Sequence, residues 1–212
     1  MTPGQPKWRR RKDARPAEIV SAALEVFAEK GFAAARLDDI AARAGVSKGA
    51  LYLYFETKQD LFEAVVRDAV LPDLDAVGQA AANPDLTLRQ LAPILATRVA
   101  QVLTTSRVPA VAKMVIAESR NFPDLARVWH DQVVSRALGV LTGVITAAQA
   151  RGEVRPGDPR YHALSLAGPM LMGVLWREVL EPVGAEPIDL AALAGQHVEA
   201  ALFGLLTEGG RS

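Results

Sequence analysis

The stretch LDDIAARAGVSKGALYLYF, residues 37–55, determines the fold of the first part of this 212-residue chain. Apolar residues recur at helical spacing over 38–44, and a second short helical segment covers 47–54. Gly45 lies between them and permits the left-handed backbone of a tight turn. Ser47 favours a helix start, because its side-chain oxygen can accept a hydrogen bond from a free amide of the first turn. The stretch therefore predicts two short helices joined by a sharp turn.

The residues on either side extend this unit. Pro16 favours a helix start, and apolar residues recur at helical spacing until Gly31, which predicts a longer helix over 16–30. Thr57, followed three residues later by Asp60, is typical of a capping pair that opens a further helix. Two short helices packed on a longer first helix make a helix-turn-helix. In such units the last helix enters the major groove of DNA.

The rest of the chain predicts a larger helical unit. Half of all residues are hydrophobic and 23% are charged, so the chain can fill a core and is not disordered as a whole. No alternating strand pattern of useful length occurs, and the predicted fold class is all-α. The segment NPDLT, at 83–87, is expected to be the hinge between the two units. Further helices are expected near 88–105, 109–120, 123–151, 159–180 and 188–207.

The charge distribution separates the front of the chain from its body. Residues 1–60 hold 11 Lys and Arg against 8 Asp and Glu, and KWRRRK at 7–12 contains no acidic residue. This pattern favours a polyanionic partner for the front alone, although an ordinary solvated tail would have the same composition. The longest nearly apolar run, 163–176, is interrupted by polar and helix-breaking residues. It is shorter than the roughly 20 residues of a membrane span, which favours a buried helix.

The segment LDDIAARAGVSKGALYLYFETKQDLFEAVV, residues 37–66, closely resembles the DNA-binding signature of the TetR/AcrR family of bacterial transcriptional regulators. The segment VFAEKGF, at 26–32, is also similar to that family. The proline-rich and basic composition of residues 1–15 predicts a basic flexible arm. The resemblance implies an N-terminal three-helix helix-turn-helix DNA-binding domain over 16–62. It also implies a larger α-helical ligand-binding and dimerisation domain over 63–212, in a homodimer that binds a pseudopalindromic double-stranded DNA operator.

By position, the resemblance places DNA contacts in and around the second short helix. Ser47 and the free amides behind it suit a phosphate, Lys48 presents a point charge, and the Tyr52 hydroxyl can donate to a phosphate. Leu53 is either a base-methyl contact or a packing residue. Family members often carry threonine where this chain has Arg36, which can contact phosphate instead. The predicted DNA-binding residues are Arg36, Ser47, Lys48, Gly49, Ala50, Tyr52, Leu53, Tyr54 and Lys58.

The resemblance also implies that the dimer forms through the helices near 159–180 and 188–207, with packing inside one chain as the alternative. A small effector is expected in the same domain, in a mostly apolar pocket. For each candidate residue, ordinary core packing is the alternative. The predicted effector-binding residues are Met114, Glu118, Phe122, Trp129, Met170 and Trp176.

Enzyme classes are disfavoured by the sequence. The chain has no cysteine, and His130, His162 and His197 lie far apart without the paired spacing of metal ligands. No phosphate-binding glycine loop and no GxSxG motif occurs. We therefore expect no metal and no cofactor. The predicted function is a cytoplasmic, ligand-responsive repressor released from its operator by a small, largely apolar effector, without a membrane partner. The alternative is a helical small-molecule carrier whose front unit no longer binds DNA.

Overall fold

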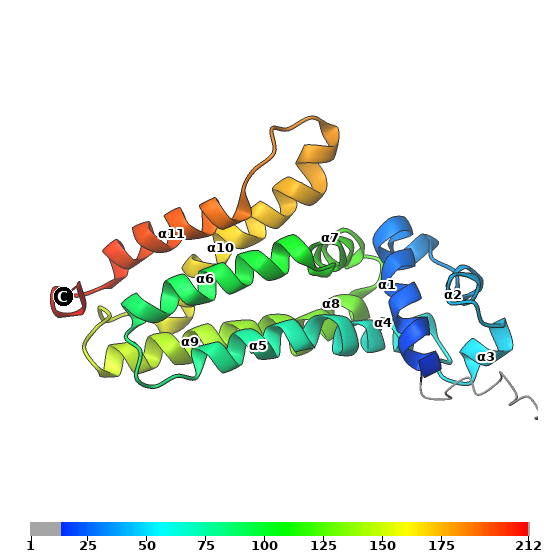
Figure 1. The fold of residues 1–212 in the computed structure, drawn as a ribbon, viewed down its shortest axis with the longest axis horizontal. Coiled ribbons are helices and arrows are strands. Elements are labelled where there is room, and N and C mark those ends of the chain that lie inside the picture. The colour runs from blue at the N-terminus through cyan, green and yellow to red at the C-terminus, as the bar shows by residue number, and fades with distance from the viewer. Residues whose placement is uncertain (1–13, 212) are drawn as a thin grey trace, which may run out of the picture.

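The computed structural model describes residues 14–211 as a series of helices with one isolated antiparallel bridge, between Val154 and Leu206 (Figure 1). The all-α prediction is confirmed for this part of the chain, and the basic segment at 7–12 lies outside it. In chain order the elements are α1 (Ala14–Ala34), α2 (Leu37–Arg43), α3 (Lys48–Tyr52), α4 (Lys58–Val65), η1 (Val66–Val70), α5 (Leu71–Ala81), α6 (Leu88–Thr105), α7 (Val108–Glu118), α8 (Pro123–Trp129), η2 (His130–Val134), α9 (Ser135–Ala150), α10 (Pro159–Leu175), η3 (Trp176–Leu180), η4 (Glu181–Val183), α11 (Leu190–Leu205) and η5 (Gly209–Arg211).

The front unit has the local geometry that its sequence predicts. The regular part of α1 ends at Gly31, whose φ of 75° is left-handed, and Gly45 has a φ of 66° in the turn between α2 and α3. The Ser47 side chain accepts a hydrogen bond from an amide of the first turn of α3, at 3.2 Å. Thr57 and Asp60 form a reciprocal capping box with bonds of 3.0 and 2.9 Å. These four predictions are confirmed.

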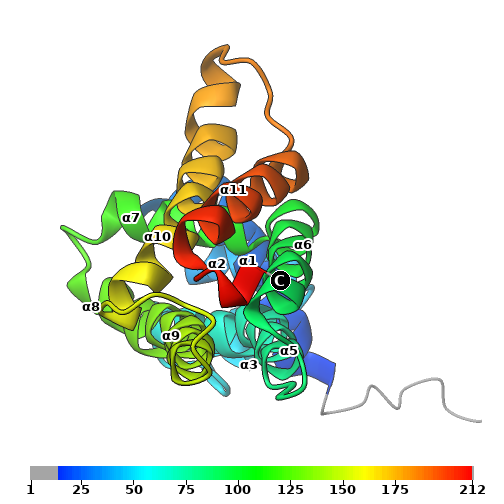
Figure 2. The same ribbon diagram turned by 90° about the vertical axis from the view of Figure 1, so that its left-hand side faces the viewer.

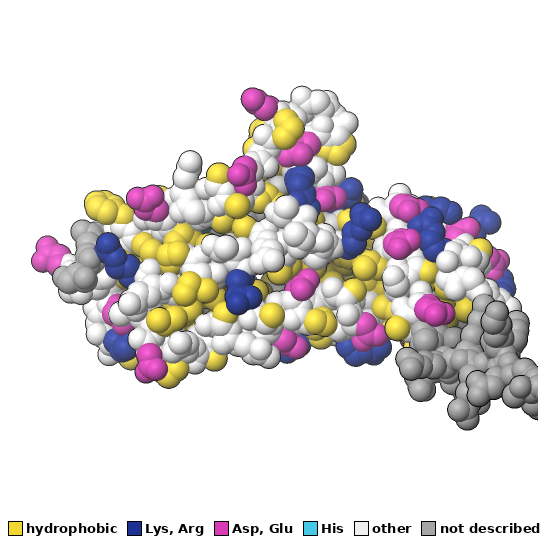
Figure 3. Space-filling model, in the orientation of Figure 1, with side chains coloured by type: hydrophobic (Ala, Val, Ile, Leu, Met, Phe, Trp, Pro, Cys, Tyr) yellow, Lys and Arg dark blue, Asp and Glu magenta, His cyan; other side chains and the backbone are white. Residues whose placement is uncertain are grey.

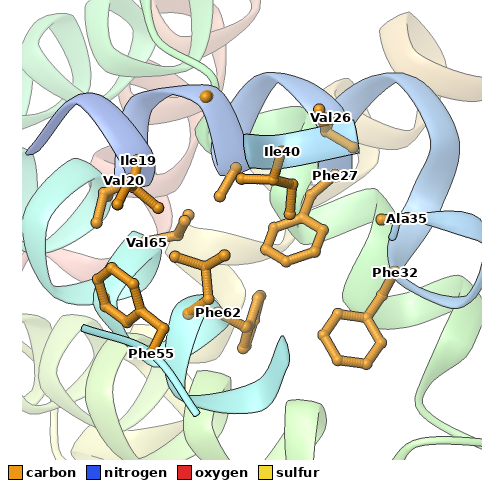
Figure 4. Packing of buried hydrophobic residues seen from close by; sticks show 14 of the residues in the cluster. Ile19, Val20, Val26, Phe27, Phe32, Ala35, Ile40, Phe55, Phe62 and Val65 are labelled. Atoms are coloured by element: carbon orange, nitrogen blue, oxygen red, sulfur yellow. The ribbon is translucent and has the colours of Figure 1, made fainter. Parts of the chain in front are cut away.

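The core of the front unit continues into α7 and α8. Phe27, Phe32 and Phe62 pack with their ring centroids 5.5 to 6.3 Å apart, in tilted and edge-on arrangements (Figure 4). Val115 of α7 and Leu125 of α8 are buried in the same cluster. Because these residues share one core with α1 and α4, α7 and α8 are fixed to the front unit.

The remaining helices form an elongated bundle behind the front unit (Figures 1 and 2). Helix α5 packs on α6 and α9, and α11 packs on α6 and α10. The segment 83–87 joins α5 to α6 at the end of the bundle far from α1, so the expected hinge position is wrong. The chain instead leaves the front unit along one continuous helical path through α4, η1 and α5.

Two π-helical turns lie next to each other where the front core meets the bundle. One is η1, between α4 and α5, and the other is η2, between α8 and α9; the two contact each other. A π turn contains one residue more than the α-helical turn it replaces, and it changes the phase of the helix that follows. In both helical paths, α4 to α5 and α8 to α9, the face that packs on the bundle is therefore rotated relative to the face that packs on the front core.

Two continuous helical stretches, Pro123–Ala150 and Pro159–Val183, have the length and the mean hydropathy of membrane spans. The second contains the apolar run 163–176, but the helix extends beyond that run at both ends. Length alone therefore does not exclude a span, contrary to the sequence-based expectation. Both stretches pack against other helices of the bundle.

Candidate nucleic-acid interface and ligand cavity

The segment around helix α3 packs into the front core on one side and is exposed to solvent on the other. Leu51 is fully buried and Phe55 is 8% exposed, and both lie in the front core. Tyr52 is 44%, Leu53 82% and Tyr54 40% exposed, although all three are large and apolar or aromatic. Leu53 therefore makes little packing contact within the chain, and the base-contact alternative is favoured for it. A short segment, α3 and the three residues after it, that is held by two buried side chains and turns three large ones outward is suited to contact another molecule.

The polar residues of α3 remain accessible. Lys48 lies 2.7 Å from a carboxylate oxygen of Asp38, and this hydrogen bond raises the pKa of Lys48. Both side chains are exposed, and exposed ion pairs contribute little stability, so a phosphate can compete for the ammonium group. A Cβ atom at Gly49 would meet nothing within 4 Å, which leaves the backbone open to close approach, and the neighbouring Ala50 is partly exposed.

Arg36 occupies the N-cap position of α2 in an extended conformation, without a side-chain cap. Its side chain is exposed. The guanidinium of Arg36 is therefore not used as a helix cap and stays available for an external anion.

Lys58 is bound inside the front unit. Its ammonium group donates hydrogen bonds to the backbone carbonyls of Phe32, Ala33 and Ala35, the last two at 3.2 and 3.0 Å, and it lies 4.4 Å from the centre of the Phe32 ring. An ammonium group has three donors, so this arrangement uses all of them. Burial lowers the pKa of Lys58, and Glu118 partly offsets that effect. The predicted role of Lys58 at the DNA backbone is corrected: it binds the end of α1.

Glu118 binds the same segment from the opposite side. Its two carboxylate oxygens accept hydrogen bonds from the backbone amides of Phe32, at 2.7 Å, and Ala33, at 2.6 Å. A Cβ atom at Gly31 would lie 2.5 Å from the carboxylate, so only glycine permits this approach. The predicted effector contact of Glu118 is therefore corrected, because the end of α7 is attached to the junction of α1 and α2.

The other effector candidates are dispersed. Met114 is buried in the front core, against which Phe122 and Trp129 also pack. The Trp176 indole donates to a backbone carbonyl at 2.9 Å and lines neither of the two chambers described next. Only Met170 of the six lines one of them. The helical periodicity could not show that Met114, Phe122 and Trp129 join the front core while Met170 lines a chamber of the bundle.

Two chambers, both partly open to solvent, lie between the helices of the bundle. The first chamber, of about 180 Å³, is lined by α6, α9, α10 and α11. The second chamber, of about 200 Å³, is lined by η1, α5, α6, η2, α9 and the start of α7. They adjoin, because they share four lining residues: Leu95, Val99, Ala137 and Leu141. Together they reach the lower part of the roughly 300–1,000 Å³ range of ligand pockets.

An open groove of about 480 Å³ lies between α6 and α11 and shares Ala96 and Val198 with the first chamber. Figure 3 shows hydrophobic side chains along the bundle, whereas charged side chains of both signs gather on the front unit. The sequence analysis missed the chambers, because their walls combine single residues from many helices. The available signal for a cavity was that the helix predicted over 88–105 carries apolar residues on two of its faces.

The three histidines occupy different environments. The Nδ1 atom of His130 lies 2.7 Å from Asp131, and both side chains are exposed. The Nε2 atoms of His162 and His197 are buried without a hydrogen-bond partner in the described part of the chain. Of these two, His197 lines the first chamber.

A helix-turn-helix with an exposed short helix, joined to a bundle with ligand-sized chambers, defines a class of DNA-binding regulators. Residues 19–65 match the family of bacterial regulatory proteins called the tetR family, and residues 90–202 match the C-terminal domain of AefR-like transcriptional repressors. The chain belongs to the TetR family, which confirms the resemblance. It is a DNA-binding transcriptional regulator rather than an enzyme.

Similar proteins extend over most of the chain. The fatty acid metabolism regulator protein of Bacillus subtilis is 25% identical over 198 residues, which cover 92% of this chain and 98% of that protein. The transcriptional repressor BepR of Brucella suis is 30% identical over 155 residues, covering 68% and 73%. The crystal structure of FadR from Bacillus subtilis in complex with stearoyl-CoA superposes with a TM-score of 0.73 at 22% identity, covering 89% and 98%.

Proposed function

We propose that this chain is a ligand-responsive repressor that binds a pseudopalindromic operator as a homodimer and leaves it when a small, largely apolar effector binds. One observation carries this proposal: a single helix, α7, connects the two sites. Its first residue, Val108, lines the second chamber, and its last residue, Glu118, holds the backbone in front of α2. An effector in the chamber thus contacts the element that positions the DNA-binding helices.

The proposed operator contacts are the accessible residues on and beside α3. In a dimer the two copies of α3 would enter successive major grooves, about 34–36 Å apart. The exposure of the α3 side chains supports this role, and Lys58 is no longer included. The proposed contacts are Arg36, Ser47, Lys48, Gly49, Ala50, Tyr52, Leu53 and Tyr54.

The proposed dimer interface is formed by α10 and α11. Tyr161, Leu164, Leu171, Met172 and Phe203 are large apolar or aromatic side chains, and each is at least half exposed. Contiguous exposed apolar surface commonly marks an interaction site, and a two-fold dimer would pair the same face of both copies. A partner copy, rather than lipid, then covers α10, in agreement with a cytoplasmic protein without a membrane partner. Analytical ultracentrifugation without detergent tests this, and a monomer would contradict it.

The proposed effector is apolar because the chambers are. Aliphatic side chains form most of both linings, and burying hydrocarbon against them releases water from apolar surface. The relative from Bacillus subtilis that was crystallised with stearoyl-CoA carries a long hydrocarbon chain in its ligand, which supports an apolar effector here.

In the proposed mechanism the dimer exists in a DNA-competent and a DNA-incompetent arrangement. An effector in the second chamber contacts Val70 of η1 and Val108 of α7, and it favours a different position of α7. Because α7 shares the core of the front unit, α2 and α3 follow this movement, and Glu118 ties the segment at Phe32 and Ala33 to it. Operator and effector binding must weaken each other by the same factor.

The test begins with selection of operator DNA from random duplexes by the full-length protein. Lys48→Ala is expected to weaken binding to the selected duplex and to reduce the salt slope by about 1, because one phosphate contact is lost. Arg127→Ala removes another exposed, ion-paired cation, which lies on α8 away from α3, and is expected to leave both quantities unchanged. Retention of no duplex, or equal effects of the two variants, would contradict the proposal.

A further inference from the structure

The chemistry of the effector can be narrowed from the shape of the chambers. They extend along α6 from Leu88 to Leu103, a distance of about 22 Å at 1.5 Å per residue. They adjoin end to end at Leu95 and Val99 rather than forming one broad space. An elongated apolar molecule fills such a path, whereas a compact ring system of similar volume fits only one chamber.

The polar lining residues indicate which of the two chambers holds the head group of the ligand. Among the described lining residues, only His197 in the first chamber and Asp73 in the second carry polar side chains. The Nε2 atom of His197 is buried and has no hydrogen-bond partner in the described part of the chain, which is costly. Because His197 lines the first chamber, a turn of its imidazole would bring Nε2 to the chamber space, where a ligand acceptor would offset that cost. Asp73 would repel an anionic or electron-rich head group at the other end. The head of the ligand therefore belongs at His197, and its tail extends towards Val70 and Val108.

The first chamber also adjoins a groove on the protein surface. The open groove between α6 and α11 shares Ala96 and Val198 with it, and Val198 follows His197 directly in α11. A bulky group attached to the ligand head can extend into this groove while the tail stays inside. The groove is lined by apolar residues and by charged residues such as Glu199, so a polar group attached to the ligand head stays solvated there.

We propose that the effector is a straight-chain fatty acyl compound whose carbonyl oxygen accepts a hydrogen bond from the Nε2–H group of His197. Its hydrocarbon chain occupies the first chamber and, when long enough, the second. The acyl group is the recognised chemistry, and it can come from an acyl thioester or from a free fatty acid. This inference rests on the proposed function, because it assigns the ligand of the same cavity.

The test uses calorimetric titration of the full-length protein with hexadecanoyl-CoA, octanoyl-CoA, hexadecanoate and CoA alone, below their micelle concentrations. The wild type is expected to bind a hexadecanoyl compound at least tenfold more tightly than octanoyl-CoA, and not to bind CoA. Binding of the thioester, of the free acid or of both supports the proposal and identifies the source. Equal affinity for the two chain lengths would overturn it.

Variants of the histidines test the head group. His197→Leu is expected to weaken hexadecanoyl binding at least tenfold, and His197→Gln, which keeps an N–H donor, to retain most of it. His162→Leu is the matched control, because it removes the other buried and unpartnered Nε2 atom, outside the lining of both chambers. Unchanged binding by His197→Leu would overturn the proposal. Should that variant fail to fold, His197→Gln and the chain-length series still decide.

Operator binding is measured in parallel on the same protein. A wild type that retains its selected duplex but binds none of the acyl compounds would overturn the acyl assignment and leave the proposed repressor function intact. Loss of specific DNA binding would instead contradict the proposed function itself.

Discussion

The front unit and the bundle are both helical and both apolar inside, but they are packed differently. In the front unit, Phe27 and Phe62 are at most 1% exposed and contact each other through their rings. In the bundle, the residues around Leu95 and Leu141 border chambers of about 180 and 200 Å³. Close-packed interiors resist deformation, whereas space within a core allows rearrangement. The part that reads DNA is thus rigid, and the part that senses the ligand is adjustable.

The connection between the two parts, helix α7, is held in the front unit by both apolar and polar contacts. Helix α7 is anchored in the front core by Val111 and Val115, so it cannot slide there freely. Glu118 attaches its end by two short hydrogen bonds to backbone amides, which are directional and fix an orientation. A small displacement of α7 therefore becomes a change in the position of one backbone segment, rather than a general loosening of the core.

The largest expected effect comes from removing a ring in the rigid part. Phe62→Ala leaves a cavity among packed aromatic rings, and we expect a loss of about 3–5 kcal/mol in the free energy of unfolding. Leu141→Ala, in the chamber wall, should cost only about 1–2 kcal/mol, because that side chain already lacks neighbours on one side. Urea denaturation measures both values. Equal losses would remove the contrast between the two parts.

Lys58→Met should have the next largest effect on the free energy of unfolding. It removes an ammonium group that satisfies three backbone carbonyls at the end of α1, and we expect a loss of about 2–3 kcal/mol. Lys48→Ala removes an exposed ammonium group from α3 and should leave the melting temperature almost unchanged while weakening operator binding. Calorimetric melting and a DNA-binding assay separate the two roles. A stable Lys58→Met protein with weak DNA binding would restore the sequence-based role of Lys58.

Glu118→Ala is expected to cost about 1–2 kcal/mol of stability, because the amides of Phe32 and Ala33 lose their acceptors. Its distinctive effect is on coupling: effector affinity should stay the same, while effector no longer changes operator affinity by the wild-type factor. Glu186→Ala, on an exposed loop, is the control. Titration of operator binding with and without effector gives the coupling factor, and an unchanged factor would exclude the two Glu118 hydrogen bonds as the connection.

The smallest effect is expected for Ser47→Ala. The variant loses the side-chain cap of α3, worth about 1 kcal/mol in comparable helices. Ser47→Gly should be milder, since glycine is tolerated at this position. Because α3 is anchored by Leu51 and Phe55, global unfolding should change little, and hydrogen exchange of the α3 amides should rise most. Uniform acceleration over the whole chain would contradict the independent behaviour of α3.

Sequence reasoning succeeded where local chemistry determines structure. Gly45, Ser47 and the Thr57–Asp60 pair act through bonds and dihedral angles within a few residues, and each was predicted with its role. It failed where the partner is distant along the chain. Glu118 binds amides 86 and 85 residues away, and Lys58 binds carbonyls more than 20 residues away, so no periodicity indicates either contact.

The effector cavity illustrates a second limit. Met114, Met170 and Trp129 all satisfy the pattern of an inward-facing residue, yet they lie in different cores. A chamber is a place where side chains from several helices fall short of each other, and that depends on helix angles that composition does not specify. His197 was noted only for its isolation from other histidines. Its unpartnered Nε2 atom becomes meaningful once the chamber around it is known.

The adjacent π turns, η1 and η2, have a consequence for protein engineering. Each additional helical residue rotates the following segment by about 100°. The two turns therefore set the rotation of the bundle helices α5 and α9 relative to α4 and α8 of the front core. A chimera that grafts residues 14–65 of this chain onto another sensor must reproduce both insertions. Deleting one residue within 66–70 alone would turn α5 away from its neighbours. The plane through these two turns is therefore the natural place to exchange modules, provided that both helices are cut and rejoined in phase.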